Sequence, residues 1–263
     1  MKSLQLSIVV ITYNCEDFLL RFLTELTDSL EPFIDYELLF FDNASSDRTV
    51  SLLNKFPQLK VNISNVNLGF AKANNILIKQ ARYQNILLLN PDVFGFNKGF
   101  WHELFQRWDH KNPLFIKLKN PDDSFQDCIG EVVSVKRIFH HYFKPINYAQ
   151  ITSITEVEMG IMAFMLATLE CFNSVGLLSE DYHMYAEDMD WCYRARKKKY
   201  RILYDPNLSL THIGSASAKK RWIDEKTQKI KYEAERIFIG KHFKGFYKLC
   251  MLLLNSIKLR KIQ

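Results

Sequence analysis

The chain has 263 residues, of which 48% are hydrophobic and 24% are charged, a normal balance for a globular protein with a sizeable core. Its five cysteines are scattered, odd in number and form no CxxC pair, which disfavours a zinc knuckle or a disulfide framework. The absence of GxGxxG and GxxxxGK[ST] motifs disfavours dinucleotide oxidoreductases and P-loop NTPases. No stretch approaches the ~18 apolar residues of a membrane span, which disfavours a membrane-spanning protein. The net charge of +6 is concentrated in residues 219–263, which hold 13 Lys and Arg against 4 Asp and Glu, whereas residues 1–218 carry a net −3.

The first ninety residues alternate apolar β-branched runs with amphipathic segments. Strands that alternate with helices at this spacing predict βαβ units and a parallel sheet. In chain order, the predicted elements are a strand at 6–12, a helix at 15–30, a strand at 36–41, a helix at 50–56, a strand at 60–64, a helix at 69–81 and a strand at 85–89.

Polar residues follow three of these predicted strands directly, at 12–14, 42–43 and 90–92. Ligands of parallel sheets bind beyond the carboxyl ends of the strands, so we expect the three segments to share one edge. Asp42 offers a pair of acceptor oxygens to a nucleobase or ribose, and an Asx-turn is its structural alternative. Asp92 suits a hard divalent cation such as Mg²⁺ or Mn²⁺, and an ordinary turn after a strand is the alternative there.

The remainder of the main domain is less regular. We interpret residues 110–155 as a variable connection with weak β character, and residues 158–176 as a strand followed by a short helix. A helix is predicted to start near Glu187, because acidic residues there give way to basic residues further on, which matches the helix dipole. Late strands and a loop are predicted over residues 201–217.

Three acids, Glu187, Asp188 and Asp190, lie within four residues at this predicted helix start. Compensation of the helix dipole explains acids there, but it does not require three. A carboxylate in a partly dry pocket makes a good general base. Trp191 follows directly and could offer a flat apolar wall to a sugar ring.

His212 is an isolated histidine, and spacing alone favours a structural role for it. Residues 214–217 are Gly, Ser, Ala and Ser, whose small side chains would let a backbone or a diphosphate come close.

Taken together, these segments resemble the family-two, inverting nucleotide-sugar glycosyltransferases. The motifs are "IVVITYN", "FFDNASSDRTV", "NVNLGFAKANN", "LLLNPD", "YAEDMDWCYRARKKKYRILYDP" and "THIGSAS", in the family's order over residues 6–217. They look most like the bacterial rhamnosyltransferase branch, where Asn-Pro-Asp replaces Asp-x-Asp. The resemblance implies an α/β GT-A nucleotide-diphospho-sugar transferase fold: a mostly parallel, Rossmann-like sheet flanked by helices, with a C-terminal helical extension.

The resemblance also implies roles for individual residues. Asp188, with Glu187 beside it, would be the catalytic base, and Asp92 and His212 would bind the divalent metal, Mg²⁺ or Mn²⁺. The donor would be bound by Thr12, Asp42, Asn67, Lys72 and Asn90.

The implied activity is metal-assisted, inverting transfer of a hexose, with L-rhamnose from dTDP-rhamnose as the preferred donor. The implied acceptor is a hydroxyl of a lipid-linked O-antigen or capsule intermediate, at the cytoplasmic face of the cell membrane. The alternatives are a UDP-sugar donor (galactose, N-acetylglucosamine or glucose) and a non-catalytic relative that binds nucleotide sugars or associates with a membrane. One departure from the family pattern is Lys199-Tyr200, where Gly-Tyr or Gly-Trp is commoner.

We divide the chain into a catalytic domain, residues 1–218, and a basic extension, residues 219–263. The end of the extension reads as a basic amphipathic helix, which is typical of an interfacial membrane binder, and a helix packed on the domain is the equal alternative. Nucleic acid is disfavoured because the basic residues alternate with aliphatic ones. The sequence leaves the oligomeric state open. The residues of the predicted apolar face are Phe243, Phe246, Tyr247, Leu249, Cys250, Leu253, Leu254 and Ile257, flanked by Lys241, Lys244, Lys248, Lys258, Arg260 and Lys261.

Overall fold

A computed structural model describes residues 4–30, 34–137, 146–182, 184–214 and 223–260. Its centre is a nine-stranded sheet of order β3-β2-β1-β4-β10-β6-β11-β5, in which β8 also pairs with β11. The strands of this sheet are β1 (Leu4–Thr12), β2 (Ile34–Asn43), β3 (Leu59–Ser64), β4 (Asn85–Leu89), β5 (Val93–Phe94), β6 (Leu114–Lys119), β8 (Thr155–Val157), β10 (Phe164–Thr168) and β11 (Ile202–His212).

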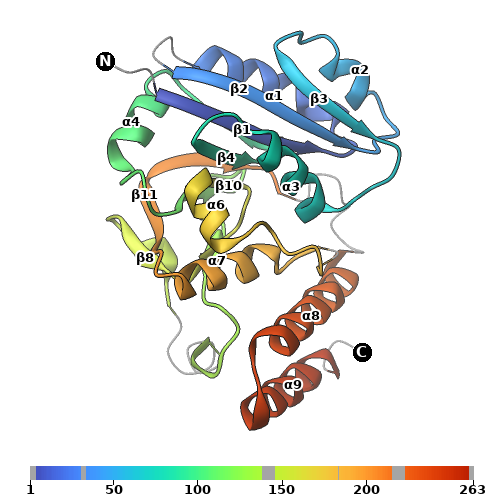
Figure 1. The fold of residues 1–263 in the computed structure, drawn as a ribbon, viewed down its shortest axis with the longest axis vertical. Coiled ribbons are helices and arrows are strands. Elements are labelled where there is room, and N and C mark those ends of the chain that lie inside the picture. The colour runs from blue at the N-terminus through green and yellow to red at the C-terminus, as the bar shows by residue number, and fades with distance from the viewer. Residues whose placement is uncertain (1–3, 31–33, 138–145, 183, 215–222, 261–263) are drawn as a thin grey trace.

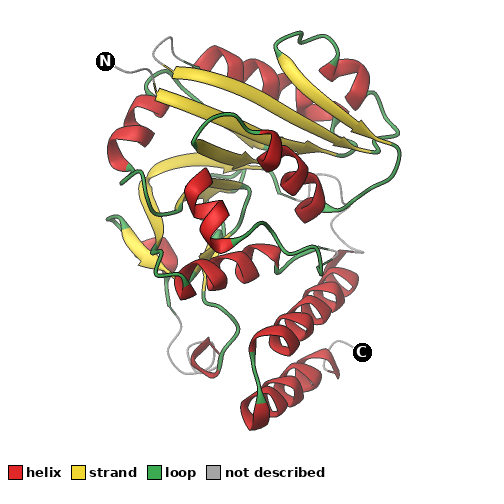
Figure 2. Ribbon diagram, viewed as in Figure 1, coloured by secondary structure: helices red, strands yellow, loops and turns green. Residues whose placement is uncertain are grey.

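Helices cover both faces of this sheet (Figures 1 and 2). Short strands β7 (Ile129–Gly130) and β9 (Met159–Gly160) form a separate antiparallel pair. The helices are α1 (Glu16–Ser29), α2 (Thr49–Leu53), α3 (Phe70–Gln80), α4 (Phe100–Arg107), α6 (Leu169–Val175), α7 (Glu187–Lys197), α8 (Ile223–His242) and α9 (Gly245–Arg260), with a 3-10 turn, η1, at Tyr148–Gln150.

The N-terminal half of the sheet, β3-β2-β1-β4, is parallel throughout, as the alternating pattern predicted. The inner strands β1, β2 and β4 contain continuous buried runs because both of their faces are covered, and Ile8, Val9 and Val10 of β1 are fully buried, whereas β3 is partly exposed. Right-handed crossovers place α1 and α2 on one face and α3 on the other, because the chain reverses its direction across the sheet after β3.

The C-terminal half of the sheet is mixed. β10 runs antiparallel to both β4 and β6, whereas β6 and β11 are parallel. The interpretation of residues 110–155 as a variable connection with weak β character underestimated their start, because β6 is a central strand whose Leu114, Phe115 and Ile116 are buried. The predicted late strands form one long strand, β11, with an irregularity between Asp205 and Ser209.

The two C-terminal helices lie against the side of the molecule that carries α7 (Figure 1). Phe238 and Ile239 of α8 are fully buried in a second apolar cluster. This cluster also contains Met189 of α7, Met251 of α9, and Val133 from the segment before the gap at residue 138. Packing of the extension on the domain is therefore observed, and the predicted boundary at residue 218 lies outside the described residues.

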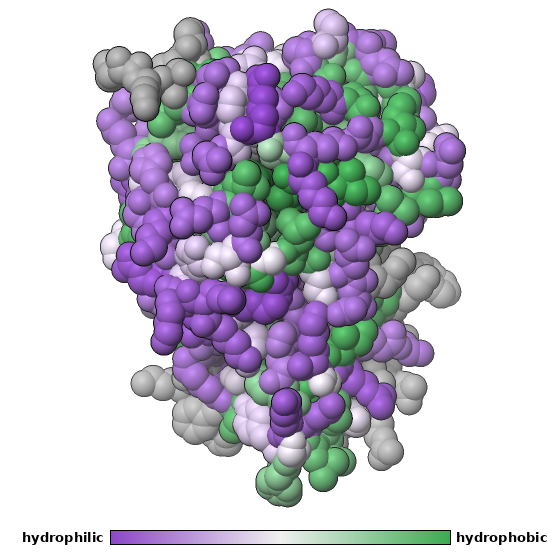
Figure 3. Space-filling view, viewed as in Figure 1, coloured by the Kyte–Doolittle hydropathy of each residue, from purple (hydrophilic) through white to green (hydrophobic). Residues whose placement is uncertain are grey.

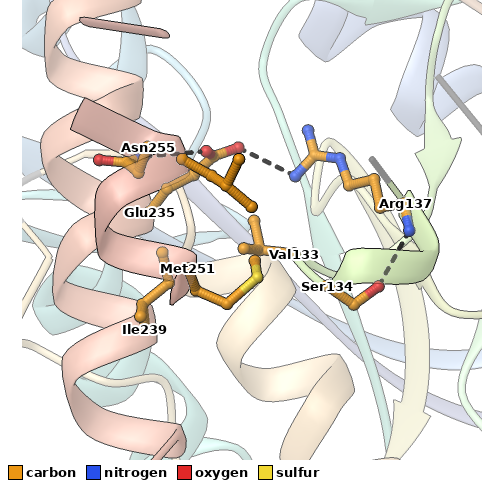
Figure 4. A pocket seen from close by; sticks show the side chains of 8 residues that line it. Val133, Ser134, Arg137, Glu235, Ile239, Met251 and Asn255 are labelled. Atoms are coloured by element: carbon orange, nitrogen blue, oxygen red, sulfur yellow. Dashed lines mark hydrogen bonds and ion pairs between the residues drawn. The ribbon is translucent and has the colours of Figure 1, made fainter. Parts of the chain in front are cut away.

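A small pocket lies where residues 132–137, α8 and α9 meet (Figure 4). The Arg137 guanidinium donates to Glu235 Oε1 at 2.9 Å, and Asn255 Nδ2 donates to Glu235 Oε2 at 3.3 Å. None of the predicted site residues lines this pocket, and its polar contacts join α8 to α9 through Asn255 and to the domain through Arg137.

Candidate active site

The edge expected for a ligand is formed by the carboxyl ends of the parallel strands. β1 and β4 are parallel neighbours in the sheet, so the segments that follow them lie at the same edge, which we call the β1–β4 edge. The arrowheads of β1, β2 and β3 point toward one side of the molecule, and α7 begins on that side (Figure 1). Residues 12–14, 42–43 and 90–92 therefore share one edge, as the sequence predicted.

Thr12 and Asp42 are paired in register at the ends of β1 and β2, and both are fully buried. Thr12 Oγ1 donates to Asp42 Oδ2 at 3.0 Å. The Ser45 N–H donates to Asp42 Oδ1 at 2.9 Å and the Ser45 hydroxyl to Oδ2 at 2.6 Å, which is the turn arrangement considered as the structural alternative. Three of the roughly four lone-pair positions of Asp42 are thus used within the chain.

The loop that follows β1 presents an aromatic ring that sequence reasoning missed. Tyr13 lies between Thr12 and Asn14 and is 52% exposed at the carboxyl edge. Asn14 Oδ1 accepts from the Ser46 N–H at 2.8 Å, which joins this loop to the one after β2. An exposed aromatic residue beside a strand end was the signal available for Tyr13.

Asn67 and Lys72 lie at the start of α3, and both side chains are exposed. Asn43, the last residue of β2, holds this region to the sheet: its Oδ1 accepts from the Leu68 N–H at 2.6 Å. Asn67 Oδ1 accepts from the Gly69 N–H at 2.9 Å, and Gly69 has a φ of +80° that suits glycine. The structure thus brings both predicted donor residues to the end of β2.

Asp92 and His212, far apart in sequence, are brought into contact by the pairing of β5 with β11, in which Val93 lies opposite His212. Asp92 Oδ1 lies 3.2 Å from His212 Nε2, and the Gly214 N–H donates to Asp92 Oδ2 at 3.2 Å. Asn90 precedes this contact and its N–H donates to the Ala163 carbonyl at 2.9 Å, which ties the segment to the start of β10. Residues 215–217 of the small-residue run lie outside the described residues.

The Asp92 carboxylate suits a hard divalent cation, and the imidazole of His212 favours Mn²⁺ over Mg²⁺ at such a pair. One carboxylate oxygen and one imidazole nitrogen face each other, and such cations are commonly held by one or two carboxylates while substrate phosphates complete the coordination. Within the described part of the chain, no group of three or more His, Cys, Asp or Glu side chains could enclose a metal by itself. A cation at this pair would therefore depend on ligands from a bound diphosphate and from water.

Glu187 and Asp188 form an unusual pair of acids at the start of α7. Tyr185 and Ala186, the two residues before them, both have a φ of +67°, a strained conformation for residues other than glycine. Such strain is often retained at functional sites, where the surrounding structure enforces it. Here it directs the chain sharply into the helix that carries both acids.

The surroundings of the two carboxylates differ. Glu187 is 8% exposed and its Oε2 has no hydrogen-bond partner; burial, followed by the charge of Asp188, raises the pKa of Glu187. Burial also raises the pKa of Asp188, but the Met189 N–H, at 2.7 Å, and the charge of Lys231 oppose that rise. Asp188 is therefore the first of the two to ionise, and Glu187 is the better candidate for a neutral carboxylic acid.

The third acid of the cluster has a structural role. Asp190 is fully buried and accepts hydrogen bonds from Tyr182 Oη at 3.0 Å, Arg194 Nε at 2.7 Å and His242 Nε2 at 2.6 Å. Although burial raises its pKa, the hydrogen bond from His242 and the charge of Arg194 more than offset that effect and hold the pKa of Asp190 below its usual value. Asp190 thereby anchors α8 to α7.

The prediction that Trp191 offers a wall to a sugar ring was wrong. Trp191 is fully buried, its Nε1–H donates to the Gly176 carbonyl at 2.9 Å, and its ring packs against Phe172. Its ring is enclosed by core side chains and its one polar group is bound to the backbone, so Trp191 belongs to the core under α7.

The sequence profile described as "Glycosyl transferase family 2" matches residues 7–166, from β1 into β10. TarS of Staphylococcus aureus strain MW2, a poly(ribitol-phosphate) β-N-acetylglucosaminyltransferase, is 24% identical over 226 residues, which cover 76% of this chain and 39% of TarS. Agl10 of Haloferax volcanii, a hexosyltransferase of low-salt glycan biosynthesis, is 22% identical over 214 residues, which cover 75% of this chain and 63% of Agl10. The chain spans less than two thirds of either relative.

Two solved structures have the same architecture. The mannosyltransferase PcManGT of Pyrobaculum calidifontis, in complex with GDP-Man and Mn²⁺, aligns with a TM-score of 0.61 at 13% identity and covers 97% of this chain and 69% of that chain. S. aureus TarS 1–349 in complex with UDP-GlcNAc aligns with a TM-score of 0.60 at 20% identity and covers 96% and 72%, respectively. These similarities establish the GT-A glycosyltransferase fold.

Proposed function

Because this chain belongs to glycosyl transferase family 2, we propose that it transfers a hexose from a nucleotide sugar to an acceptor hydroxyl at the β1–β4 edge. The observation that carries this proposal is the contact between Asp92 and His212 at that edge. Two residues from distant parts of the sequence form a cation-binding pair beyond the carboxyl ends of the strands, where ligands of such sheets bind.

The donor nucleotide would lie over the ends of β1 and β2. The exposed ring of Tyr13 offers a stacking surface for the base, and the Thr12–Asp42 pair retains acceptor capacity beneath it. Lys72 and Asn67, at the start of α3, are exposed and close to this edge. The ammonium group of Lys72 and the side-chain amide of Asn67 would bind the diphosphate of the donor there. Asn90 completes the predicted donor set beside Asp92.

Asp92 and His212 would hold the divalent cation, Mg²⁺ or Mn²⁺. When bound, that cation supplies neutralisation of the charge that develops on the departing nucleoside diphosphate. The PcManGT structure, which contains Mn²⁺ with GDP-Man, supports a cation of this kind in the fold.

The acceptor side of the reaction would use Asp188. Its carboxylate removes the proton from the acceptor hydroxyl, the oxygen attacks the anomeric carbon, and the bond from that carbon to the diphosphate breaks with inversion. Lys231 stabilises the ionised form of Asp188, which keeps a base available beside the unpartnered Glu187. Glu187 in its neutral form adds no second negative charge as the proton is transferred.

Two donors are supported by different observations. The Asn-Pro-Asp segment and the other motifs favour dTDP-L-rhamnose, as in the rhamnosyltransferase-like branch that the sequence resembles. The similarity to TarS, solved with UDP-GlcNAc, favours a UDP-linked N-acetylhexosamine. We keep dTDP-L-rhamnose as the preferred donor and UDP-GlcNAc as the alternative.

The acceptor we propose is a lipid-linked glycan intermediate, which α9 would help the enzyme to reach at the inner face of the cell membrane. Phe246, Leu249 and Leu253 are 81%, 55% and 57% exposed, and their spacing places them on one face of α9. Lys244 and Lys248 lie on the same helix hairpin, so apolar and cationic groups occur together, as in interfacial helices. No helix within the described residues is long and apolar enough to cross a membrane.

A thermal-shift panel of nucleotide sugars, with Mn²⁺ and with EDTA, tests the donor site. A ligand present at 100 times its Kd adds about 2.7 kcal/mol of apparent stability. We expect a Mn²⁺-dependent shift with dTDP-rhamnose or UDP-GlcNAc that is lost in Asp92→Ala. A wild-type protein that shifts with no nucleotide sugar, while its unfolding stays cooperative, would contradict the proposal.

A further inference from the structure

We propose that Gln126 is a positioning residue that fixes the tautomer of His212, so that the lone pair of Nε2 is offered to a cation together with Asp92 Oδ1. The inference deepens the proposed function and rests on its cation site. Gln126 carries no family motif identified from the sequence, and it lies in the segment that was interpreted as a variable connection. Its contacts within the site are what assign it this role.

The orientation of the Gln126 amide follows from its two acceptors. Its Nε2 donates to the His212 carbonyl at 3.1 Å and to Asn120 Oδ1 at 3.0 Å. A backbone carbonyl can only accept, and Asn120 presents its oxygen because its own Nδ2 donates to Ser124 Oγ at 2.9 Å and to the Phe125 carbonyl at 3.4 Å. The amide nitrogen is therefore held on that side, and Oε1 faces the imidazole.

The tautomer of His212 follows from the amide orientation. Gln126 Oε1 lies 2.6 Å from His212 Nδ1, and an amide oxygen can only accept, so Nδ1 carries the proton. In the neutral ring the lone pair is then on Nε2, which lies 3.2 Å from Asp92 Oδ1. Metal-binding histidines commonly donate their other ring N–H to an oxygen in this way. A cation that takes Nε2 and Oδ1 as ligands would satisfy both atoms at once.

The surrounding backbone leaves the amide little room to turn over. The Gln126 N–H donates to the Leu118 carbonyl at 3.0 Å, which ties the residue to β6. Gly214 has a φ of +54°, and a Cβ there would lie 3.3 Å from Gln126 Nε2 and 3.6 Å from His212 Nδ1. His212 itself is 8% exposed. The ring, the amide and the glycine backbone therefore pack as one unit around Asp92.

Two variants separate positioning from a merely structural role. Gln126→Met keeps the length of the side chain but removes both hydrogen-bonding atoms, whereas Gln126→Glu keeps an oxygen acceptor for Nδ1–H. We expect Gln126→Met to weaken Mn²⁺ binding in the presence of UDP by about 10–100-fold, the usual effect of losing the outer partner of a metal-bound histidine. Gln126→Glu should bind Mn²⁺ within a few-fold of wild type. Gln150→Met, at an exposed glutamine in η1, is the matched control.

The measurements are Mn²⁺ affinity by electron paramagnetic resonance and the imidazole ¹⁵N spectrum of His212 in the metal-free protein near pH 8. The expected spectrum shows the Nδ1–H tautomer in wild type and a mixture in Gln126→Met. Equal Mn²⁺ affinity in wild type and Gln126→Met, or an Nε2–H tautomer in wild type, would overturn the inference and leave the cation site intact. A wild type that binds no Mn²⁺ with UDP or with dTDP would instead refute the proposed cation site, and the ¹⁵N spectra would still decide whether Gln126 sets the tautomer.

Discussion

At the scale of single residues, Glu187 and Asp188 differ in the groups that surround their carboxylates. Glu187 is buried with an unpartnered oxygen, whereas Asp188 has a backbone N–H at 2.7 Å and the charge of Lys231 nearby. Two interacting acids in one site ionise in sequence, and here the surroundings favour Asp188 as the first. This order gives one ionised base and one neutral acid near neutral pH.

Asp188→Asn should lower kcat by about 10²–10⁴-fold, because the amide cannot accept the acceptor proton. Donor affinity measured by titration should stay within a few-fold of wild type, since the donor residues lie on other elements. Asp181→Asn, which replaces an exposed acid before the same helix, is the control and should keep normal turnover. Near-normal turnover in Asp188→Asn would show that another group is the base.

Glu187→Gln should stabilise the protein increasingly as the pH rises. Burial raises the pKa of Glu187 above its value of about 4.3 in the unfolded chain, so its contribution to stability is present at low pH and is lost as the pH rises toward the folded pKa. Glutamine cannot ionise, so the Tm difference between variant and wild type should grow between about pH 4 and pH 8, the folded pKa of Glu187 being about 8, and level off above that. A constant difference over that range, like the one expected for Glu170→Gln at an exposed site, would contradict the assignment.

The strand pattern located some site residues and missed others. Thr12, Asp42 and Asn90 follow apolar runs, so the chain itself places them at strand ends. His212 meets Asp92 only through the pairing of β5 with β11, which no local periodicity predicts. Gln126 gives no signal at all, since its importance lies in a contact across 86 positions of the chain.

At the scale of elements, α7 has non-glycine residues in the left-handed region beside both ends. At its C-terminal end, Lys199 has a φ of +70°, the Tyr200 N–H donates to the Ala195 carbonyl at 3.1 Å and the Lys199 N–H to the Arg196 carbonyl at 3.0 Å. This is the Schellman arrangement, in which glycine is the preferred residue at the position of Lys199. The structure therefore gives a reason for the common glycine that the family pattern has there.

Lys199→Gly should stabilise the protein by about 0.5–1 kcal/mol, because glycine adopts a positive φ without a steric penalty. Lys198→Gly is the matched control: Lys198 is also exposed but has a φ of −84°, so glycine there should be neutral or destabilising by up to about 1 kcal/mol. Chemical denaturation of both variants measures the two effects. A loss of stability in Lys199→Gly would contradict this account of the helix end.

Helices and strands could be predicted from the sequence where they are part of a local βαβ pattern, and were missed where their strand partners lie far away in the sequence. The β1–α1–β2 and β3–α3–β4 units follow from periodicity, because the strands and helices alternate at βαβ spacing, although only β1 and β2 of these strand pairs are neighbours in the sheet. The insertion of β10 between β4 and β6 joins segments far apart in sequence, and the apolar run "LFIKL" at 114–118 was hidden by the polar residues around it. Helix α4 (Phe100–Arg107) was missed although Phe100, Trp101 and Leu104 share a buried face.

At the scale of the whole molecule, charge and exposed apolar surface meet at the C-terminal helices. Figure 3 shows apolar atoms at the lower end of the molecule, where Figure 1 places α9. Met251 and Asn255 are the buried residues of α9. Phe246, Leu249 and Leu253 are exposed and therefore do not contribute to packing of α9 against α8. The side chains of residues 257–260 and all of 261–263 lie outside the described residues.

Replacing Phe246, Leu249 and Leu253 together by serine should abolish binding to anionic vesicles in a flotation assay, because each buried apolar side chain contributes about 1.5–3 kcal/mol. Ile63→Ser, at a 55% exposed isoleucine of β3, is the control and should bind as wild type does. Lys244→Gln should weaken binding to anionic vesicles by about 1 kcal/mol and leave binding to neutral vesicles unaffected. Undiminished flotation of the triple variant would refute the membrane role of α9.

The central claim is that the β1–β4 edge binds a nucleoside diphosphate together with a divalent cation held by Asp92 and His212. The most direct measurement is isothermal titration of wild type and Asp92→Ala with UDP, GDP and dTDP, in Mn²⁺ and in EDTA. We predict that at least one nucleotide binds wild type in Mn²⁺ and that its affinity falls at least tenfold both in EDTA and in Asp92→Ala. Equal affinities in Mn²⁺ and EDTA, or no binding of any of the three to folded wild type, would contradict it.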